Sequence, residues 1–137
     1  MFLPTNQKEM KERGWNSCDI IIVTPDAYVD HPSFAMAILG RFLEKNGYKV
    51  GILTQPRWQN PKSFLELGIP NLAWAVSSGN MDSMVLNYTA NKKRRAEDLY
   101  AENGNPFFEG TEKSIKNKIR PDRTISVFSN KIRQVEK

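Results

Sequence analysis

The feature that most constrains the fold of this sequence is a strand–helix–strand pattern near its N-terminus. Residues 18–24 form a short, continuous run dominated by β-branched side chains, which predicts a central strand buried on both faces. Residues 32–46 predict a helix, and Gly47 is typical of the position just after a helix end. Residues 48–54 predict a second strand. This order is a βαβ unit, in which the strands lie parallel and the crossover is right-handed.

The predicted helix over 32–46 has an apolar face. Large and small apolar side chains recur there at helical spacing, and we expect this face to pack on the sheet: Phe34, Ala35, Ile38, Leu39, Phe42 and Leu43.

The remaining sequence extends this pattern. Residues 61–67 predict a short helix, 71–76 a third strand and 81–89 another short helix. Residues 124–129 predict a fourth strand, with the start of a helix after it. Alternating strands and helices predict an α/β protein, a small Rossmann-like or flavodoxin-like three-layer domain with a mostly parallel sheet of about four strands. The 137 residues suit one domain, and we expect it to be a piece of a larger protein.

Residues 91–123 interrupt this pattern as a long irregular insertion. They are polar, carry several glycines and prolines, and show no apolar periodicity. Such a stretch within a compact domain is usually functional or disordered.

Composition excludes several classes of protein. No apolar run is long enough to cross a membrane, and the first residues lack the apolar core of a secretory signal. The single cysteine, Cys18, excludes an internal disulfide framework and a multi-cysteine metal site; we expect an inert buried thiol and a cytoplasmic location. The net charge of +5 arises entirely in the last 27 residues, so it does not by itself indicate a nucleic-acid-binding domain.

Polar residues follow two of the predicted strands, where open α/β sheets bind their ligands. We expect ligand contacts from these side chains: Asp26, Tyr28, Asp30, His31, Ser78, Gly79, Asn80 and Asp82. The loop with Asp26, Asp30 and His31 is compatible with a metal or acid–base site, or with a helix-capping aspartate and a histidine bonded to backbone. The loop with Ser78, Gly79 and Asn80 is compatible with phosphate binding by backbone N–H groups, or with an ordinary turn. Neither a G-x-G-x-x-G motif nor a P-loop is present.

A basic run within the insertion is a further candidate for phosphate contacts: Lys92, Lys93, Arg94 and Arg95. Glu97 and Asp98 follow directly, which favours a solvated surface with local charge pairing.

Longer motifs give the sequence a family likeness that covers essentially the whole chain. They lie at residues 2–4, 9–10, 14–15, 19–21, 26–34, 47–52, 55–56, 79–84, 88–95 and 120–123. With these motifs the chain resembles the N-terminal domain of YgiQ-type proteins, a family of radical SAM enzymes. The likeness implies a domain, residues 1–137, that is similar to the cobalamin-binding domains preceding the catalytic barrel in many such enzymes.

The resemblance also implies where the chemistry lies. In the family, a C-x-x-x-C-x-x-C loop further along the chain holds a [4Fe–4S] cluster that binds S-adenosylmethionine. With one cysteine this chain cannot hold that cluster, so we expect an accessory domain that contributes to substrate or cofactor binding and performs no catalysis alone. Its expected partner is the radical SAM barrel, in the same chain or as a split gene product.

Two alternatives remain open. Cobalamin is a candidate cofactor, although the D-x-H-x-x-G signature is not met, because Val29 stands two before His31 and Phe34 three after it. The alternative function is a stand-alone module that binds RNA or another phosphate-bearing ligand through the basic C-terminal tail and the basic run 92–95. If the chain binds RNA through phosphate contacts, its affinity for RNA falls steeply with added salt, which distinguishes this function from the accessory role. The sequence does not name the substrate.

Overall fold

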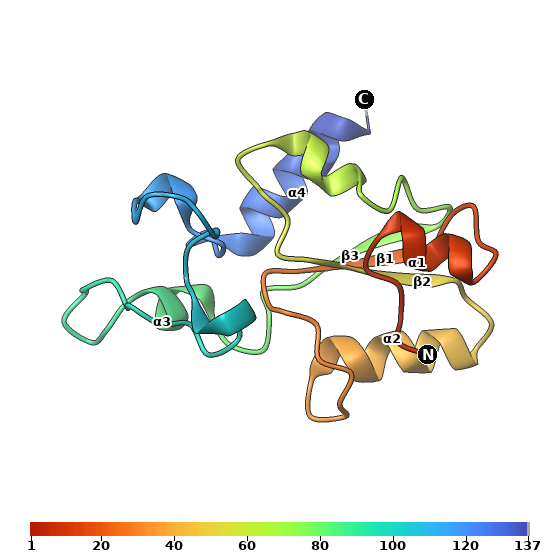
Figure 1. The fold of residues 1–137 in the computed structure, drawn as a ribbon, viewed down its shortest axis with the longest axis horizontal. Helices are drawn as coiled ribbons and strands as arrows, with labels where there is room; N and C mark the ends of the chain where they lie inside the picture. Colours follow the sequence, from red (N-terminus) through yellow and green to blue (C-terminus); the bar gives the residue numbers. More distant parts are fainter. Residues whose placement is uncertain (137) are drawn as a thin grey trace.

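A three-stranded parallel sheet lies at the centre of the fold (Figure 1). A computed structural model describes residues 1–136. The strands are β1 (Ile20–Thr24), β2 (Val50–Thr54) and β3 (Ala73–Val76). Their order is β2-β1-β3, with Ile20 opposite both Val50 and Ala73. The predicted central strand, βαβ unit and parallel α/β class are therefore confirmed.

Helices cover both faces of the sheet. The α-helices are α1 (Gln7–Glu12), α2 (Ala35–Lys45), α3 (Ser83–Asn87) and α4 (Thr124–Val135), and 3₁₀ turns span Pro61–Leu65, Glu102–Gly104 and Ile115–Asn117. Helix α2 packs on β1 and β2, whereas α4 packs on β3 and on the 3₁₀ turn Pro61–Leu65 on the opposite side (Figure 1). These positions give the three layers of a Rossmann-like domain.

The alternation of side chains along β1 explains the two cores. Ile22 belongs to the cluster under α2, with Leu3, Val50 and Ile52. Ile21 and Val23 point to the other face and belong to the cluster that contains Phe64, Phe128 and Ile132. Because successive strand residues point to opposite faces, a run of buried β-branched residues fills both cores.

The predicted fourth strand is wrong. Residues 124–129 lie in helix α4, and the sheet has three strands in the described chain. A short apolar run does not by itself distinguish strand from helix. Here Thr124, Phe128 and Ile132 recur every four residues and are all buried, which is a helical face.

The predicted core face of α2 is also wrong in part. Its buried residues are Ala37 and Gly40. A Cβ on residue 40 would collide with the Leu3 side chain and lie 3.5 Å from Ile52 of β2, so glycine allows the helix to pack closely here. Because Ala37 and Gly40 face inward, Ile38, Leu39 and Phe42 lie on the outer side of α2, where each is more than half exposed.

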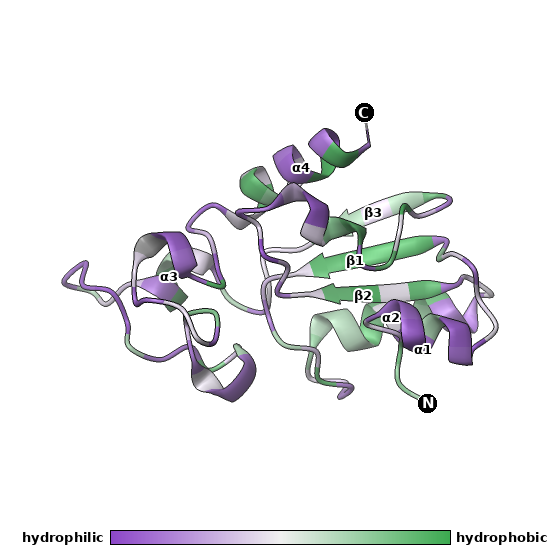
Figure 2. Cartoon of the chain, turned by 45° about the horizontal axis from the view of Figure 1, so that its top comes forward, coloured by the Kyte–Doolittle hydropathy of each residue, from purple (hydrophilic) through white to green (hydrophobic). Residues whose placement is uncertain are grey.

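The insertion 91–123 lies beyond the carboxyl ends of the strands, together with α3 (Figure 1). Figure 2 shows that apolar residues concentrate in β1 and β2, whereas this end of the molecule is largely hydrophilic. The insertion nevertheless buries Ala101 and Ile119, together with three charged residues, Asp98, Lys118 and Arg120. Within residues 1–136, every helix is too short or too polar to cross a bilayer.

Candidate functional site

Asp26, the first predicted site residue, lies at the carboxyl end of β1 and is only 1% exposed. One carboxylate oxygen accepts hydrogen bonds from the backbone N–H of Asn80 at 2.7 Å and from its side-chain amide at 2.9 Å. The other oxygen accepts from the Arg120 guanidinium. Asp26 therefore connects the loop after β3 and the insertion to the central strand.

Arg120 completes this buried group, which we call the Asp26 cluster (Asp26, Asn80, Asp98 and Arg120). Its side chain is 1% exposed and its Nε donates to Asp98 at 2.9 Å. Two carboxylates thus face one guanidinium away from water. Buried charges persist in this way when they are paired and hydrogen-bonded.

Gly79 gives the cluster its close packing. Its φ is +95°, and a Cβ there would lie 2.7 and 2.8 Å from the two Asp26 carboxylate oxygens. Asn80 continues the connection, because its side-chain oxygen accepts from the N–H of Ala35 at the start of α2 at 3.3 Å. Of the predicted residues, Asp26 and Asn80 are therefore hydrogen-bonded to each other, and Gly79 packs against the Asp26 carboxylate while its N–H donates to the Ser77 hydroxyl at 2.9 Å.

Tyr28 and Asp30 form a separate group with Arg41 of α2. The Arg41 guanidinium donates to both Asp30 oxygens, at 3.1 and 2.5 Å, and the Tyr28 hydroxyl donates to Asp30 at 2.9 Å. The bonds from Arg41 hold the pKa of Asp30 below its usual value. Burial, and then the bond to Asp30, raise the pKa of Tyr28 to about 12.

His31 lies next to this group and is exposed. Its Nδ1 accepts from the backbone N–H of Ser33 at 3.1 Å, which is the backbone-bonded alternative of the sequence analysis. Asp30 does not cap the helix; it binds Arg41 instead. The polar residues of the loop after β1 thus belong to two separate groups. Asp26 lies in the Asp26 cluster, and Asp30 lies in the group with Tyr28 and Arg41.

The remaining predicted residues lie around α3. The Asp82 carboxylate caps this helix by accepting from the N–H of Met84 at 2.9 Å. Ser78 and Asp82 line a shallow cavity of about 410 Å³ beside the start of α4. Lys92, Lys93 and Arg94 are exposed on a turn, whereas the Arg95 side chain donates to the carbonyl of Val85 at 2.8 Å.

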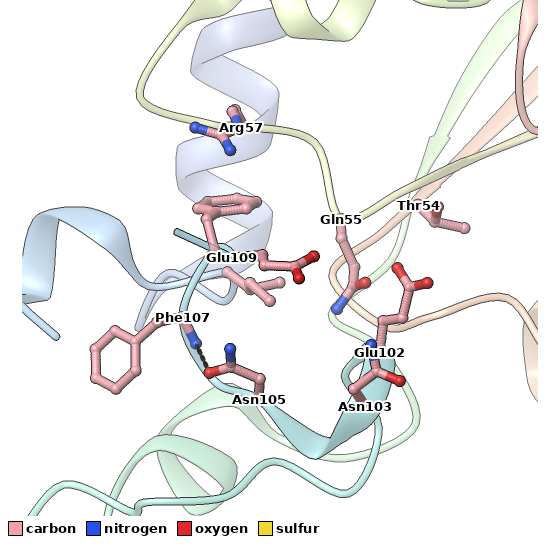
Figure 3. Close-up of a pocket in the computed structure, with 10 residues that line it drawn as sticks. Thr54, Gln55, Arg57, Glu102, Asn103, Asn105, Phe107 and Glu109 are labelled. Carbon is pink, nitrogen blue, oxygen red and sulfur yellow. Dashed lines mark hydrogen bonds between the residues drawn. The ribbon is translucent and has the colours of Figure 1, made fainter. Parts of the chain in front are cut away.

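A cavity of about 510 Å³ lies at the carboxyl end of β2 (Figure 3). Strand β2 and the loop after it contribute Thr54, Gln55 and Arg57, and the insertion contributes the rest of the wall: Glu102, Asn103, Asn105, Phe107, Phe108, Glu109 and Ile119. The Arg57 guanidinium lies 4.8 Å from the centre of the Phe108 ring. A carboxyl-edge position is where open parallel sheets bind ligands.

Gln55 is the unusual residue of this cavity. Its φ is +45°, a conformation that non-glycine residues rarely adopt. Its amide nitrogen is buried and has no hydrogen-bond partner among the described residues. In the view of Figure 3 this amide points between the carboxylates of Glu102 and Glu109. Gln55 and Glu102 also line a second cavity of about 360 Å³ on the side of Phe2 and Tyr28.

The described residues do not fit an iron–sulfur cluster. Cys18 is fully buried, and burial, reinforced by Asp19, raises the pKa of its thiol to about 11. A cluster ligand must be a thiolate. Among residues 1–136, no group of three histidine, cysteine or acidic side chains is placed to hold a metal ion.

The parallel sheet and the helices on its two faces define a small Rossmann-like α/β domain with cavities at its carboxyl edge. The family described as Radical SAM N-terminal matches residues 2–137, and the chain belongs to this family. The family resemblance noted in the sequence is thereby confirmed.

Among curated proteins the chain is similar to a UPF0313 protein of Vibrio parahaemolyticus, with 54% identity over 99% of the chain. It is 52% identical to a UPF0313 protein of Vibrio cholerae and 51% identical to one of Pseudomonas aeruginosa. The chain spans only 16% of the length of each of these relatives. It therefore corresponds to a single domain of much longer proteins. No solved structure matches it.

Sequence reasoning did not find Arg120, Asp98, Gln55 and Glu102 as residues of this region. Arg120 and Asp98 lie in the insertion, where no periodicity indicates burial. Gln55 directly follows a predicted strand, and this position at a carboxyl edge was the one available signal.

Proposed function

We propose that this chain is an accessory ligand-binding domain of a longer radical SAM protein, with the ligand in the cavity at the carboxyl end of β2. The observation that carries the proposal is the unpartnered Gln55 amide in the wall of that cavity. A buried amide without a partner is unfavourable. A ligand oxygen that accepts from this nitrogen after a small shift of the wall removes that cost.

The lining of the cavity indicates the kind of ligand. The carboxylates of Glu102 and Glu109 accept hydrogen bonds from hydroxyl or amine groups, and the Arg57 guanidinium donates to ligand oxygens. Phe107 and Phe108 offer apolar surface to the remainder of the molecule. We infer a polar organic molecule that carries both hydroxyl or amine groups and an apolar part.

Catalysis in this proposal belongs to the rest of the longer protein. Radical SAM enzymes use a [4Fe–4S] cluster and S-adenosylmethionine to generate a radical, and Cys18 alone cannot hold such a cluster. This chain's own residues position the ligand and exclude water from one side of it.

The test uses the longer protein that contains this domain. Formation of 5′-deoxyadenosine from S-adenosylmethionine is measured with and without a low-molecular-weight cell extract. We expect the increase in rate caused by the extract to be at least tenfold smaller in Arg57→Ala and in Glu102→Gln. The rate without extract should stay the same. Glu97→Gln is the matched control, because Glu97 is exposed and does not line the cavity. Equal stimulation in all variants contradicts the proposal.

The proposal also predicts the behaviour of residues 1–137 alone. After treatment with iron and sulfide, this chain should neither bind a cluster nor cleave S-adenosylmethionine. Cleavage by the purified chain would place catalytic machinery within it and refute an accessory role.

Cobalamin is a candidate ligand because His31 is exposed and only its Nδ1 is bonded within the described chain, which leaves Nε2 as the nitrogen for a metal. An absorbance titration of the chain with hydroxocobalamin tests this assignment. We expect a spectral change that His31→Ala abolishes. No change on titration removes cobalamin as a ligand.

RNA binding is the second candidate function, because Lys92, Lys93 and Arg94 are exposed together. Phosphate contacts predict an affinity that falls steeply with added salt. Binding at low salt that is lost in Lys92→Ala/Lys93→Ala supports this function, and no binding at low salt removes it.

A further inference from the structure

The outer face of helix α2 is apolar and open to solvent. Ile38, Leu39 and Phe42 are 52%, 51% and 64% exposed. Positions i, i+1 and i+4 lie together on one side of a helix, so the three side chains form one patch, which we call the α2 patch. Single exposed apolar residues are ordinary, whereas a contiguous group on a surface typically marks an interaction site.

Two of the charged residues of α2, Arg41 and Glu44, are paired, whereas Lys45 is exposed three residues after Phe42. Arg41 binds Asp30 and, at 3.0 Å, Glu44, and Glu44 also accepts from Arg13 at 2.7 Å. An apolar centre with a polar rim is the anatomy of a protein–protein interface. A nucleic-acid or anionic membrane surface requires a cluster of unpaired cations, which Lys45 alone does not form.

A small cavity adjoins the α2 patch at Ile38. It has a volume of about 240 Å³, and its walls include Pro32, Ala37 and the stem of Arg41. A pocket of this kind beside exposed apolar residues accepts an apolar side chain of a partner, as the strongest contacts of interfaces commonly do.

We propose that the α2 patch is the surface on which the remainder of the longer protein packs. The relatives carry this domain as 16% of their length, so most of each chain lies outside it. A three-residue patch is far smaller than the roughly 800 Å² per partner that separate chains need. A tethered segment packs on such a surface at high effective concentration, which favours the same polypeptide over a second copy.

This inference does not depend on the proposed ligand site. The α2 patch lies on the helix, whereas the cavity of Gln55 and Glu102 lies at the carboxyl end of β2. The two proposals therefore succeed or fail separately.

The experiment measures the rate of maleimide labelling at single introduced cysteines, by mass spectrometry of the peptide that carries each. Phe42→Cys is compared with Leu72→Cys, because Phe42 and Leu72 are equally exposed at 64%. Each variant is labelled in residues 1–137 alone and in the longer protein. Cys18 does not interfere, since it is fully buried.

We expect labelling at residue 42 to be at least tenfold slower in the longer protein than in residues 1–137, and labelling at residue 72 to change less than twofold. Equal rates at residue 42 in the two proteins would overturn the proposal. Protection at residue 42 that appears in residues 1–137 alone and grows with protein concentration would also overturn it, because it would assign the patch to a second copy.

Discussion

At the scale of single residues, the candidate site is organised by Asp26. Sequence reasoning offered this residue as a ligand contact, and the structure places its carboxylate in bonds to Asn80 and Arg120. A buried carboxylate that accepts from the Asn80 backbone, the Asn80 side chain and Arg120 acts as a connector of chain segments. Ligand contacts are therefore expected from the partly exposed neighbours that it holds in place.

Gly79 tests this packing. Gly79→Ala places a Cβ against the Asp26 carboxylate and keeps an unfavourable φ, so we expect a loss of more than about 2 kcal/mol in the free energy of unfolding, measured with urea. Gly110→Ala is the matched control. Gly110 has φ +72° with nothing within 4 Å of its Cβ position, so only the backbone strain of about 1 kcal/mol applies. Equal losses would show that the contact with Asp26 is unimportant.

Cys18 predicts a dependence of stability on alkaline pH. Burial raises the pKa of the thiol from its ordinary value of 9.0 to about 11 in the folded chain. Between these values the unfolded chain has released the proton while the folded chain retains it, so stability that is present below pH 9.0 falls as the pH rises toward about 11. Urea unfolding of Cys18→Ala should show a shallower decline than the original chain over this range. Parallel curves would refute the assignment.

At the scale of elements, helix α4 covers the face of the sheet opposite α2. Its Phe128 ring meets Phe64 edge-to-face, with centroids 5.4 Å apart. The strand predicted for this segment was plausible on β-branched composition, but four-residue spacing and the contact with Phe64 favour the helix. A contact across 64 positions of sequence is invisible to local pattern reading.

The packing of α4 on the rest of the domain therefore depends on Phe128. We expect Phe128→Ala to lower the free energy of unfolding by about 3–5 kcal/mol, because the side chain is fully buried. Ile125→Ala in the same helix should cost less than about 1 kcal/mol, since Ile125 is exposed. Similar losses in thermal or urea unfolding would contradict the burial of this face.

At the scale of the whole molecule, polar contacts join the insertion to the loops that follow β1 and β2. Arg120 reaches Asp26, the N–H of Ala27 donates to the carbonyl of Tyr100 at 2.7 Å, and the indole N–H of Trp58 donates to the carbonyl of Lys118 at 2.8 Å. The insertion in turn supplies most of the cavity wall around Gln55. The integrity of the proposed ligand site therefore depends on the Asp26 cluster.

Replacing Arg120 should release the insertion. Arg120→Met leaves two buried carboxylates without their cation, and we expect a loss of about 3–5 kcal/mol and faster proteolytic cleavage within residues 91–123. Arg123→Met, at an exposed position nearby, should change neither. Unchanged cleavage in Arg120→Met would show that other contacts hold the insertion.

The sequence by itself determined the βαβ unit, the parallel α/β class, the family and the lack of cluster cysteines. Apolar strand runs, residues that mark helix ends and the identities of single residues are all local signals. Only the tertiary structure decided that α4 is a helix, that the face of Ala37 and Gly40 is the inner face of α2, and that Arg120 meets Asp26. Each of these depends on contacts between segments far apart in the chain. Over 124–129 the sequence carries both a β-branched run and a four-residue spacing, and packing against distant residues such as Phe64 selects the helix.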